Sequence, residues 1–532
     1  MERFGKTTDG VYRALTQGGR KQKFSVKDRR RNLEAREMLR GSGILLSIAS
    51  LPSPYGIGTL GREAYRFVDL LVDLKQRYWQ VLPVGPTIYG DSPYQPMSGC
   101  AGNIYFIDLD KLADEGLLQK EEIQGYNWGA DESEIDYEKL YQNRCKILQK
   151  AFQRFDTNAQ DFQDFVAKHS EWLGKYALYM ALKNDNLDKN WYEWPEQFKN
   201  LLPVALANYR KERYNVISFW EFCQYKFFQQ WQELRSYANT RGIQIIGDLS
   251  FYVGYDSADV WSERDLFLLC ANGKLSYVAA AGPDKYSDDG QVWGNPIYDW
   301  DRMKEDDFSW WRRRMRVSRE LFDIIRIDHF AGIVKAYAVP YGQERISSGK
   351  WIKGPGRKFI NAVNEELQGV HVIADDYTSA SLLPGVKKLL AKSGWMGIKV
   401  MLFAFDGDPA NAYLPHNYTD PHVAAYIGTH DNETIVGSFR EKTDYELAYL
   451  YEYLNIDNKA QIPGALIRAL YQSTADLAIV QMQDILELGN EARMNYPSTV
   501  GHNWRWRLTS REQMLSNEKR TWIRNIAVVY RR

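Results

Sequence analysis

The feature that most constrains the fold of this chain is a buried strand that ends in a carboxylate. Residues 324–330 read Ile-Ile-Arg-Ile-Asp-His-Phe, so β-branched apolar residues lead directly to Asp328. A strand that is apolar along most of its length is typical of a parallel sheet covered on both faces. A carboxylate at the carboxyl end of an inner barrel strand would lie in the mouth where barrel enzymes carry out their chemistry, with Arg326 holding it ionised. The alternative is that Asp328 caps the following helix.

Two further strands repeat this pattern. Residues 372–376 read Val-Ile-Ala-Asp-Asp, and residues 424–432 read Ala-Ala-Tyr-Ile-Gly-Thr-His-Asp-Asn. Asp375 and Asp431 are therefore expected at strand ends, each separated from the preceding acid by the length of a strand and a helix. Because parallel barrel strands all open on the same side, we expect the three carboxylates to share one cup, and two of them suffice for glycoside chemistry.

Apolar runs predict eight strands along the chain. They lie at residues 43–49, 78–84, 243–249, 324–330, 370–375, 397–405, 423–430 and 476–482. Helical spacing of apolar residues separates several of them, at 62–76, 356–367, 384–393 and 443–454. Eight parallel strands joined by right-handed helical crossovers are typical of a (β/α)8 barrel. The sequence therefore predicts an α/β fold of the TIM-barrel class.

The barrel pattern is interrupted twice. Residues of about 85–242 are mainly helical in pattern, and residues of about 251–320 predict long loops with helices. We therefore expect one catalytic barrel domain over residues 42–532, carrying these two large insertions. Residues 1–41 are rich in Lys and Arg and poor in apolar residues, which predicts a basic arm on the surface.

Composition excludes several classes of partner and site. The charges cancel, with 68 Lys and Arg against 68 Asp and Glu, so neither nucleic acid nor a membrane surface is an expected partner. No apolar run is long enough to span a bilayer and no signal peptide is evident, which predicts a cytoplasmic protein. The four cysteines are scattered without a CxxC pair, so neither a disulfide framework nor a zinc site is expected. Aromatic residues make up 14% of the chain, which suits the stacking of sugar rings.

At these motifs the sequence resembles the amylomaltases, or disproportionating enzymes, which are 4-α-glucanotransferases of the α-amylase clan. The resemblance runs in order from Ser42 to about Leu508 and is carried by residues 53–58, 89–95, 256–261, 290–296, 326–330, 405–409, 428–432 and 491–495. It implies the transfer of segments between maltooligosaccharides or other α-1,4-glucans such as starch and glycogen. It also implies that neither a metal nor an organic cofactor is needed.

The resemblance assigns roles to individual residues. It implies that Asp328 is the nucleophile, that Asp375 is the general acid and base, and that Asp431 hydrogen-bonds sugar hydroxyls and favours distortion of the ring. It further implies a set of substrate-binding positions, namely Ser92, Tyr94, Asp248, Trp293, Asn295, Arg326, His329 and His430.

The general acid is where the sequence departs from the family. The family reads Ile-Ala-Glu-Asp-Leu-Gly, whereas residues 373–378 of this chain read Ile-Ala-Asp-Asp-Tyr-Thr. An acid shortened by one methylene retreats by about 1.5 Å, and a misplacement of about 1 Å costs roughly 100-fold in rate. Ala331 also replaces the usual Arg. We therefore expect a retaining 4-α-glucanotransferase of weakened activity. Two alternatives stay open: a catalytically impaired paralogue that binds maltodextrin or starch, and an α-glucan hydrolase.

Overall fold

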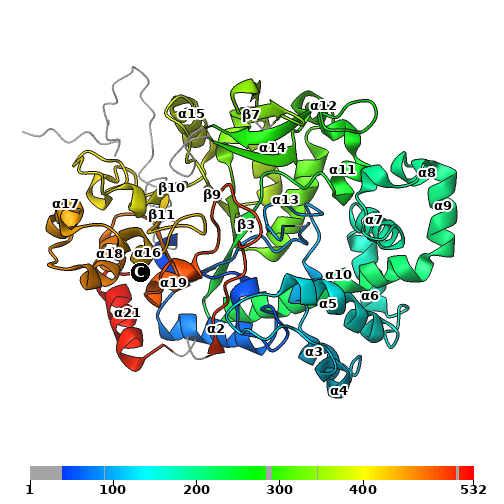
Figure 1. Ribbon diagram of the computed structural model, residues 1–532, viewed down its shortest axis with the longest axis horizontal. Helices are drawn as coiled ribbons and strands as arrows, with labels where there is room; N and C mark the ends of the chain where they lie inside the picture. Colours follow the sequence, from blue (N-terminus) through cyan, green and yellow to red (C-terminus); the bar gives the residue numbers. More distant parts are fainter. Residues whose placement is uncertain (1–38, 89, 283–289, 344–345, 511–514) are drawn as a thin grey trace, which may run out of the picture.

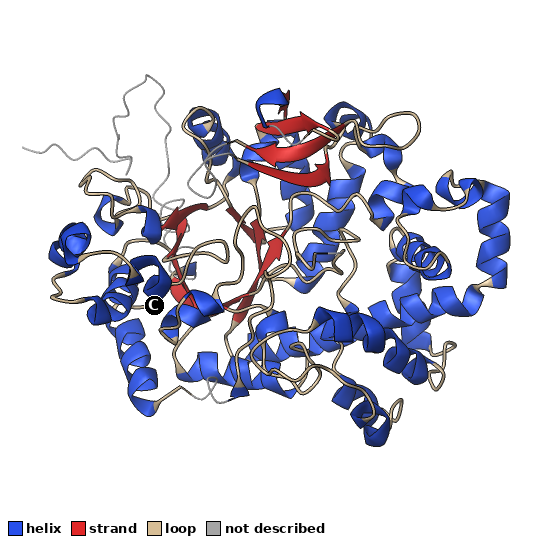
Figure 2. Cartoon of the chain, viewed as in Figure 1, coloured by secondary structure: helices blue, strands red, loops and turns tan. Residues whose placement is uncertain are grey.

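The computed structural model describes residues 39–88, 90–282, 290–343, 346–510 and 515–532. Most of the predicted basic arm, residues 1–38, lies outside these ranges. Eight parallel strands form the central sheet, which appears as a ring in Figure 2. In spatial order they are β10 (Gly397–Val400), β11 (Val423–Tyr426), β12 (Leu477–Gln481), β1 (Gly41–Leu45), β2 (Tyr78–Gln80), β3 (Gln244–Leu249), β6 (Ile324–Ile327) and β9 (His371–Ala374).

The ring is closed by a bridge between Ile373 in β9 and Met396, the residue before β10. Two backbone hydrogen bonds hold this seam, because the Met396 N–H donates to the carbonyl of Val372 at 2.9 Å and the Ala374 N–H donates to the Met396 carbonyl at 2.7 Å. The TIM barrel predicted from the strand pattern is therefore confirmed. All eight predicted strands are present, and each is shorter than the apolar run that predicted it.

Amphipathic helices cover the outside of the barrel. In α2, for example, Ala64, Phe67, Val68 and Leu71 are fully buried at spacings of three and four residues, so one stripe of the helix faces the strands. The covering helices are α2 (Arg62–Asp73), α10 (Tyr214–Thr240), α13 (Ser309–Leu321), α14 (Arg357–Leu367), α15 (Leu383–Ser393), α17 (Asp444–Leu454), α18 (Ile462–Gln472) and α21 (Asn517–Val529). No helix in the described parts of the chain is both long and apolar enough to cross a bilayer.

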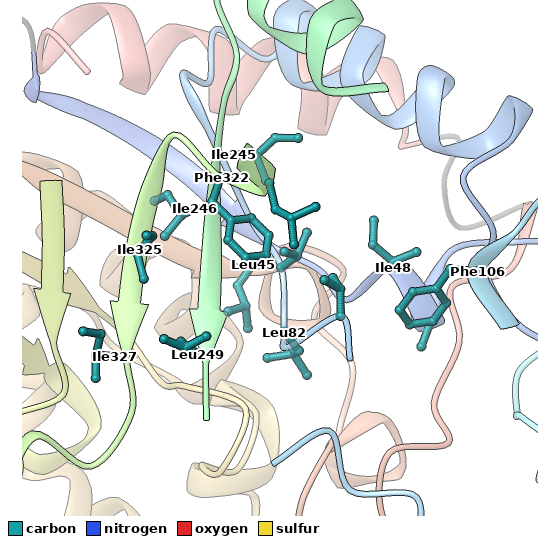
Figure 3. Close-up of a cluster of buried hydrophobic side chains, with 14 of the residues drawn as sticks. Leu45, Ile48, Leu82, Phe106, Ile245, Ile246, Leu249, Phe322, Ile325 and Ile327 are labelled. Carbon is teal, nitrogen blue, oxygen red and sulfur yellow. The ribbon is translucent and has the colours of Figure 1, made fainter. Parts of the chain in front are cut away.

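The apolar core lies between the strands and these helices. Figure 3 shows Ile245, Ile325 and Phe322 within this layer, and all three are buried. Phe322 packs directly on the backbone of β3, because a Cβ added to Gly247 would lie only 2.2 Å from its ring. Glycine is therefore required at this point of β3, since any side chain would displace the ring that packs β3 against the start of β6.

The chain between β2 and β3 is helical, and its helices lie to the right of the barrel in Figure 1. The longest is α10, whose 27 residues pack mainly against α7. Phe222, Phe227 and Trp231 are fully buried on α10, which explains the aromatic pattern of this segment. The helices that precede it are α3 (Leu109–Asp114), α4 (Lys120–Gln124), α5 (Tyr137–Phe152), α6 (Gln160–Lys168), α7 (Leu173–Asp185), α8 (Glu196–Lys199) and α9 (Pro203–Glu212).

A second sheet was missed by the sequence analysis. It has four antiparallel strands in the order β5 (Gln291–Pro296), β4 (Tyr277–Ala281), β7 (Lys335–Pro340) and β8 (Lys350–Lys353), and lies above the ring in Figure 2. The segment 251–320, expected to hold loops and helices only, therefore contributes two strands. β4 reads Tyr-Val-Ala-Ala-Ala, so it lacks the alternation by which strands are recognised and has a single β-branched residue, Val278.

Candidate active site

The parallel register places four predicted site residues on the inner face of the barrel. Asp248 lies opposite Arg326 in the pairing of β3 with β6, and Ile327 lies opposite Ala374 in the pairing of β6 with β9. The next residues along, Asp328 and Asp375, are therefore neighbours just beyond the strand ends. Side chains two residues apart point the same way, so these acids share a face with Arg326 and Asp248.

Arg326 holds these carboxylates together. Its Nη1 lies 2.6 and 2.7 Å from the two oxygens of Asp248 and 3.2 Å from Asp328 Oδ1, while its Nη2 lies 2.9 Å from Asp375 Oδ2. The Asp248 side chain has no exposed surface, whereas Asp328 and Asp375 keep 26% and 19% of theirs. Asp248 therefore serves to fix the guanidinium, and the other two acids face the open space.

The electrostatics of Asp328 reflect this crowding. Burial raises the pKa of its carboxyl well above the usual aspartate range; the charge of Arg326 opposes this shift, and the carboxylate of Asp375 adds to it. Arg326 therefore favours the ionised form of Asp328, which is the form that the predicted nucleophile needs.

Asp431 reaches the same space from the loop after β11. Its Oδ1 accepts a hydrogen bond from Asn495 Nδ2 at 2.7 Å and lies 3.5 Å from His430 Nε2. The other ring nitrogen of His430 lies 3.3 Å from the hydroxyl of Tyr94, whose ring is stacked on the imidazole. The Tyr94 hydroxyl donates to Asp248 at 2.9 Å, so the polar network that positions Asp431 continues to the Arg326 cluster.

His329 occupies a left-handed backbone conformation, with φ and ψ both 49°. This conformation is uncommon for a residue with a side chain and typically persists where the surrounding structure enforces it. The ring meets Trp293 edge-on at a centroid distance of 4.8 Å, and burial lowers the pKa of His329 to about 4, so the imidazole is neutral. Its Nε2 is buried and has no hydrogen-bond partner within the described ranges.

Asn295 and Gln95 form a reciprocal amide pair. Asn295 Nδ2 donates to Gln95 Oε1 at 3.1 Å, and Gln95 Nε2 donates to Asn295 Oδ1 at 3.0 Å and to the carbonyl of Trp293 at 2.7 Å. The pair ties β5 to the loop after β2. Asn295 is almost fully buried, and it holds Gln95, which in turn donates to the Trp293 carbonyl.

These residues surround one cavity of about 650 Å³, a size typical of a ligand site. Nine of the eleven predicted site residues line it: Ser92, Tyr94, Trp293, Asn295, Asp328, His329, Asp375, His430 and Asp431. Asp248 and Arg326 lie behind its wall. In the described parts of the chain, no group of three His, Cys, Asp or Glu side chains is arranged to hold a metal ion.

Sequence reasoning gave no role to several residues that the structure brings to the site. Gln95 and Asn495 both position predicted residues, and Arg493 donates to the backbone carbonyl of Asp431 at 2.7 Å. All three lie within the motifs that carried the resemblance. Their hydrogen bonds join segments far apart in the chain, so only the folded structure reveals what they do.

The chain is similar to known glucanotransferases along most of its length. A family model described as 4-alpha-glucanotransferase matches residues 46–513. The 4-alpha-glucanotransferase of Streptococcus pneumoniae is 42% identical over 499 residues, which is 93% of this chain and 97% of that one. The 4-alpha-glucanotransferase of Thermus thermophilus is 40% identical over 483 residues, covering 89% and 95% of the two chains. The amylomaltase from Streptococcus agalactiae in complex with acarbose superimposes with a TM-score of 0.88 at 38% identity, covering 93% of this chain and 99% of that one.

A barrel whose strand ends bring a cluster of acids into one cavity is typical of the class of enzymes that act on glycosidic bonds. Within that class the similarity is specific in both sequence and structure. The chain belongs to the 4-alpha-glucanotransferase family and is an enzyme of this type, so the resemblance to the amylomaltases is confirmed.

Proposed function

We propose that the chain transfers α-1,4-glucan segments between maltooligosaccharides by a retaining double displacement. The observation that carries the proposal is the position of Asp328 and Asp375, held by one guanidinium at the wall of a single cavity. Retaining glycoside chemistry requires two carboxyl groups close together, one to attack and one to move a proton.

In the first step Asp328 attacks the anomeric carbon of the donor while Asp375 protonates the departing glycosidic oxygen. The departing chain then leaves a glucosyl group bonded to Asp328. In the second step Asp375 removes the proton from the 4-hydroxyl of an acceptor, which attacks the anomeric carbon and releases Asp328. Two inversions at the same carbon retain the α configuration.

The surrounding side chains bind and orient the sugar in this scheme. Asp431, held by Asn495, accepts hydrogen bonds from sugar hydroxyls, and the neutral ring of His329 lines the space where the sugar binds. The ring of Trp293 offers an apolar surface to the face of a glucose unit. Ser92, Tyr94 and His430 line the same space.

The short side chain of Asp375 limits the rate in this proposal. Its Oδ2 lies 2.9 Å from Arg326, so the carboxyl is drawn toward the barrel wall. An acid that stops short of the glycosidic oxygen weakens both proton transfers, because each needs hydrogen-bond contact with the reacting oxygen.

Incubation with maltotriose tests the proposed function. Glucose together with maltotetraose and longer products is the expected result, with no net gain of reducing ends. A gain of reducing ends without longer products would instead identify a hydrolase. Unchanged maltotriose at high protein concentration, with the sugar still bound, would contradict the transferase and indicate an impaired binding protein.

A further inference from the structure

The cavity extends beyond the carboxylates to a pair of stacked tyrosines. Tyr192 and Tyr255 both line it, with ring centroids 4.7 Å apart and planes inclined by 12°. Tyr255 lies in the loop that follows β3. Tyr192 comes from η3 (Trp191–Glu193), a single turn between α7 and α8, on the side of the barrel where Figure 1 shows the inserted helices. The insertion therefore supplies an aromatic ring to the cavity.

Buried contacts fix this pair before any ligand arrives. Trp191 is fully buried, its Nε1 donates to the Tyr255 carbonyl at 2.8 Å, and its backbone N–H donates to Asp256 Oδ1 at 3.1 Å. Lys183 in α7 neutralises Asp256 at 2.6 Å. The Tyr255 hydroxyl donates to the Gly273 carbonyl at 2.7 Å. Since both rings are held from behind, a ligand that stacks here does not have to order them.

The exposed side of the pair is aromatic. The Tyr192 ring is partly exposed, and its hydroxyl makes no hydrogen bond within the described ranges. Asn190 lines the cavity beside it, and its Nδ2 donates to the exposed carboxylate of Glu193 at 2.8 Å. Asp256, behind the rings, is paired with Lys183. Flat rings next to hydrogen-bonding groups suit a pyranose, which has apolar C–H faces and hydroxyls at its edges.

We propose that Tyr192 and Tyr255 form a platform that binds glucosyl units of longer α-glucans, away from the bond that is broken. The inference rests on the proposed function and deepens it, because it makes chain length a determinant of affinity. A glucan long enough to reach both the carboxylates and the platform gains an additional stacking contact, whereas a short glucan seated at the carboxylates does not.

The test compares the Kd of maltotriose and maltoheptaose by calorimetry, in an Asp328→Asn background that prevents turnover. Tyr192→Ala is expected to weaken maltoheptaose binding about 3- to 10-fold, the equivalent of one aromatic stacking contact, and to weaken maltotriose binding by less. Tyr192→Phe keeps the ring and is expected to retain the maltoheptaose affinity within about twofold. Tyr445→Ala removes a tyrosine that is 91% exposed on α17 and serves as the matched control, with no change in either Kd.

Equal losses on the two sugars, or a maltoheptaose affinity that survives Tyr192→Ala, would overturn the platform. If Tyr192→Ala lacks a cooperative thermal transition, Tyr192→Leu provides the same comparison with an apolar side chain of substantial volume. The proposed function fails by a different result, namely wild-type protein that binds maltoheptaose without converting it. Because the platform is assessed from binding alone, the two failures are distinguishable.

Discussion

Lengthening the general acid should accelerate this enzyme. In the structure Asp375 Oδ2 is bonded to Arg326 at 2.9 Å, at the level where β6 and β9 end. Asp375→Glu adds one methylene, which moves the carboxyl about 1.5 Å further into the cavity from an unchanged backbone. Arg326 remains fixed by Asp248, so the rest of the cluster keeps its geometry.

The size of the effect follows from that displacement. A misplacement of about 1 Å at a reacting group costs roughly 100-fold in rate, or about 2.7 kcal/mol at the transition state. We expect Asp375→Glu to raise kcat about 10- to 100-fold, because the carboxyl would then reach the glycosidic oxygen. KM should change little, since the proton is transferred only in the transition state.

The assay measures initial rates of glucose release from maltotriose at saturating substrate, with the longer products analysed in parallel. Asp375→Asn cannot give or take the proton and should lower kcat below the wild-type value. Asp301→Glu makes the same substitution at a side chain that is 94% exposed on α12 (Trp300–Glu305) and should leave kcat unchanged. A kcat for Asp375→Glu equal to or below wild type would refute the reasoning that reach limits the rate.

Three other perturbations have defined outcomes. Asp328→Asn should lower the rate of transfer by at least about a thousandfold. It should also raise Tm at neutral pH, because the raised pKa of Asp328 means that ionising this carboxyl costs folding free energy. Calorimetry should show the gain in Tm shrinking as pH falls into the range where the wild-type carboxyl is protonated in both the folded and the unfolded state. Asn495→Ala removes the 2.7 Å hydrogen bond to Asp431 and should lower kcat about 10- to 100-fold without lowering Tm by more than a few degrees. An unchanged kcat would show that Asp431 does not need this hydrogen bond. Burial raises the pKa of Asp484 to about 7, so ionisation of this carboxyl should lower the free energy of unfolding as pH rises from about 4 to 7, and the loss should then level off. Denaturant unfolding of Asp484→Asn should show a free energy of unfolding without this contribution.

The parts of the fold that repeat along the chain could be predicted from the sequence. Strands buried on both faces appear as continuous apolar runs, and where such a run ends in an acid, the geometry of a parallel barrel places that acid at the mouth. Asp328 and Asp375 were predicted in this way, and the register puts them side by side. The second sheet could not be recognised, because its short strands alternate poorly and their pairing joins residues such as Ala279 and Ala338 across a long stretch of sequence.

The supporting contacts of the site could not be predicted for a related reason. Asp248 comes near the end of an apolar run like the other acids, and the sequence analysis predicted that it contacts the substrate. The structure separates it from them, because its position opposite Arg326 buries both oxygens against the guanidinium. Similarly, the pairing of Gln95 with Asn295 depends on the approach of two loops, which no local pattern specifies.

The charge balance of the cluster explains how two chemically identical acids can take different roles. Arg326 carries one positive charge and is engaged most closely by Asp248, whose side chain has no exposed surface. Little positive charge is then left for the other two acids, and ionising Asp328 and Asp375 together would place two negative charges side by side in a poorly solvated site. Asp328 lies beside the nitrogen that Asp248 holds. The proposed mechanism needs the proton on Asp375, so a substrate oxygen that accepts a hydrogen bond from Asp375 would select the reactive arrangement.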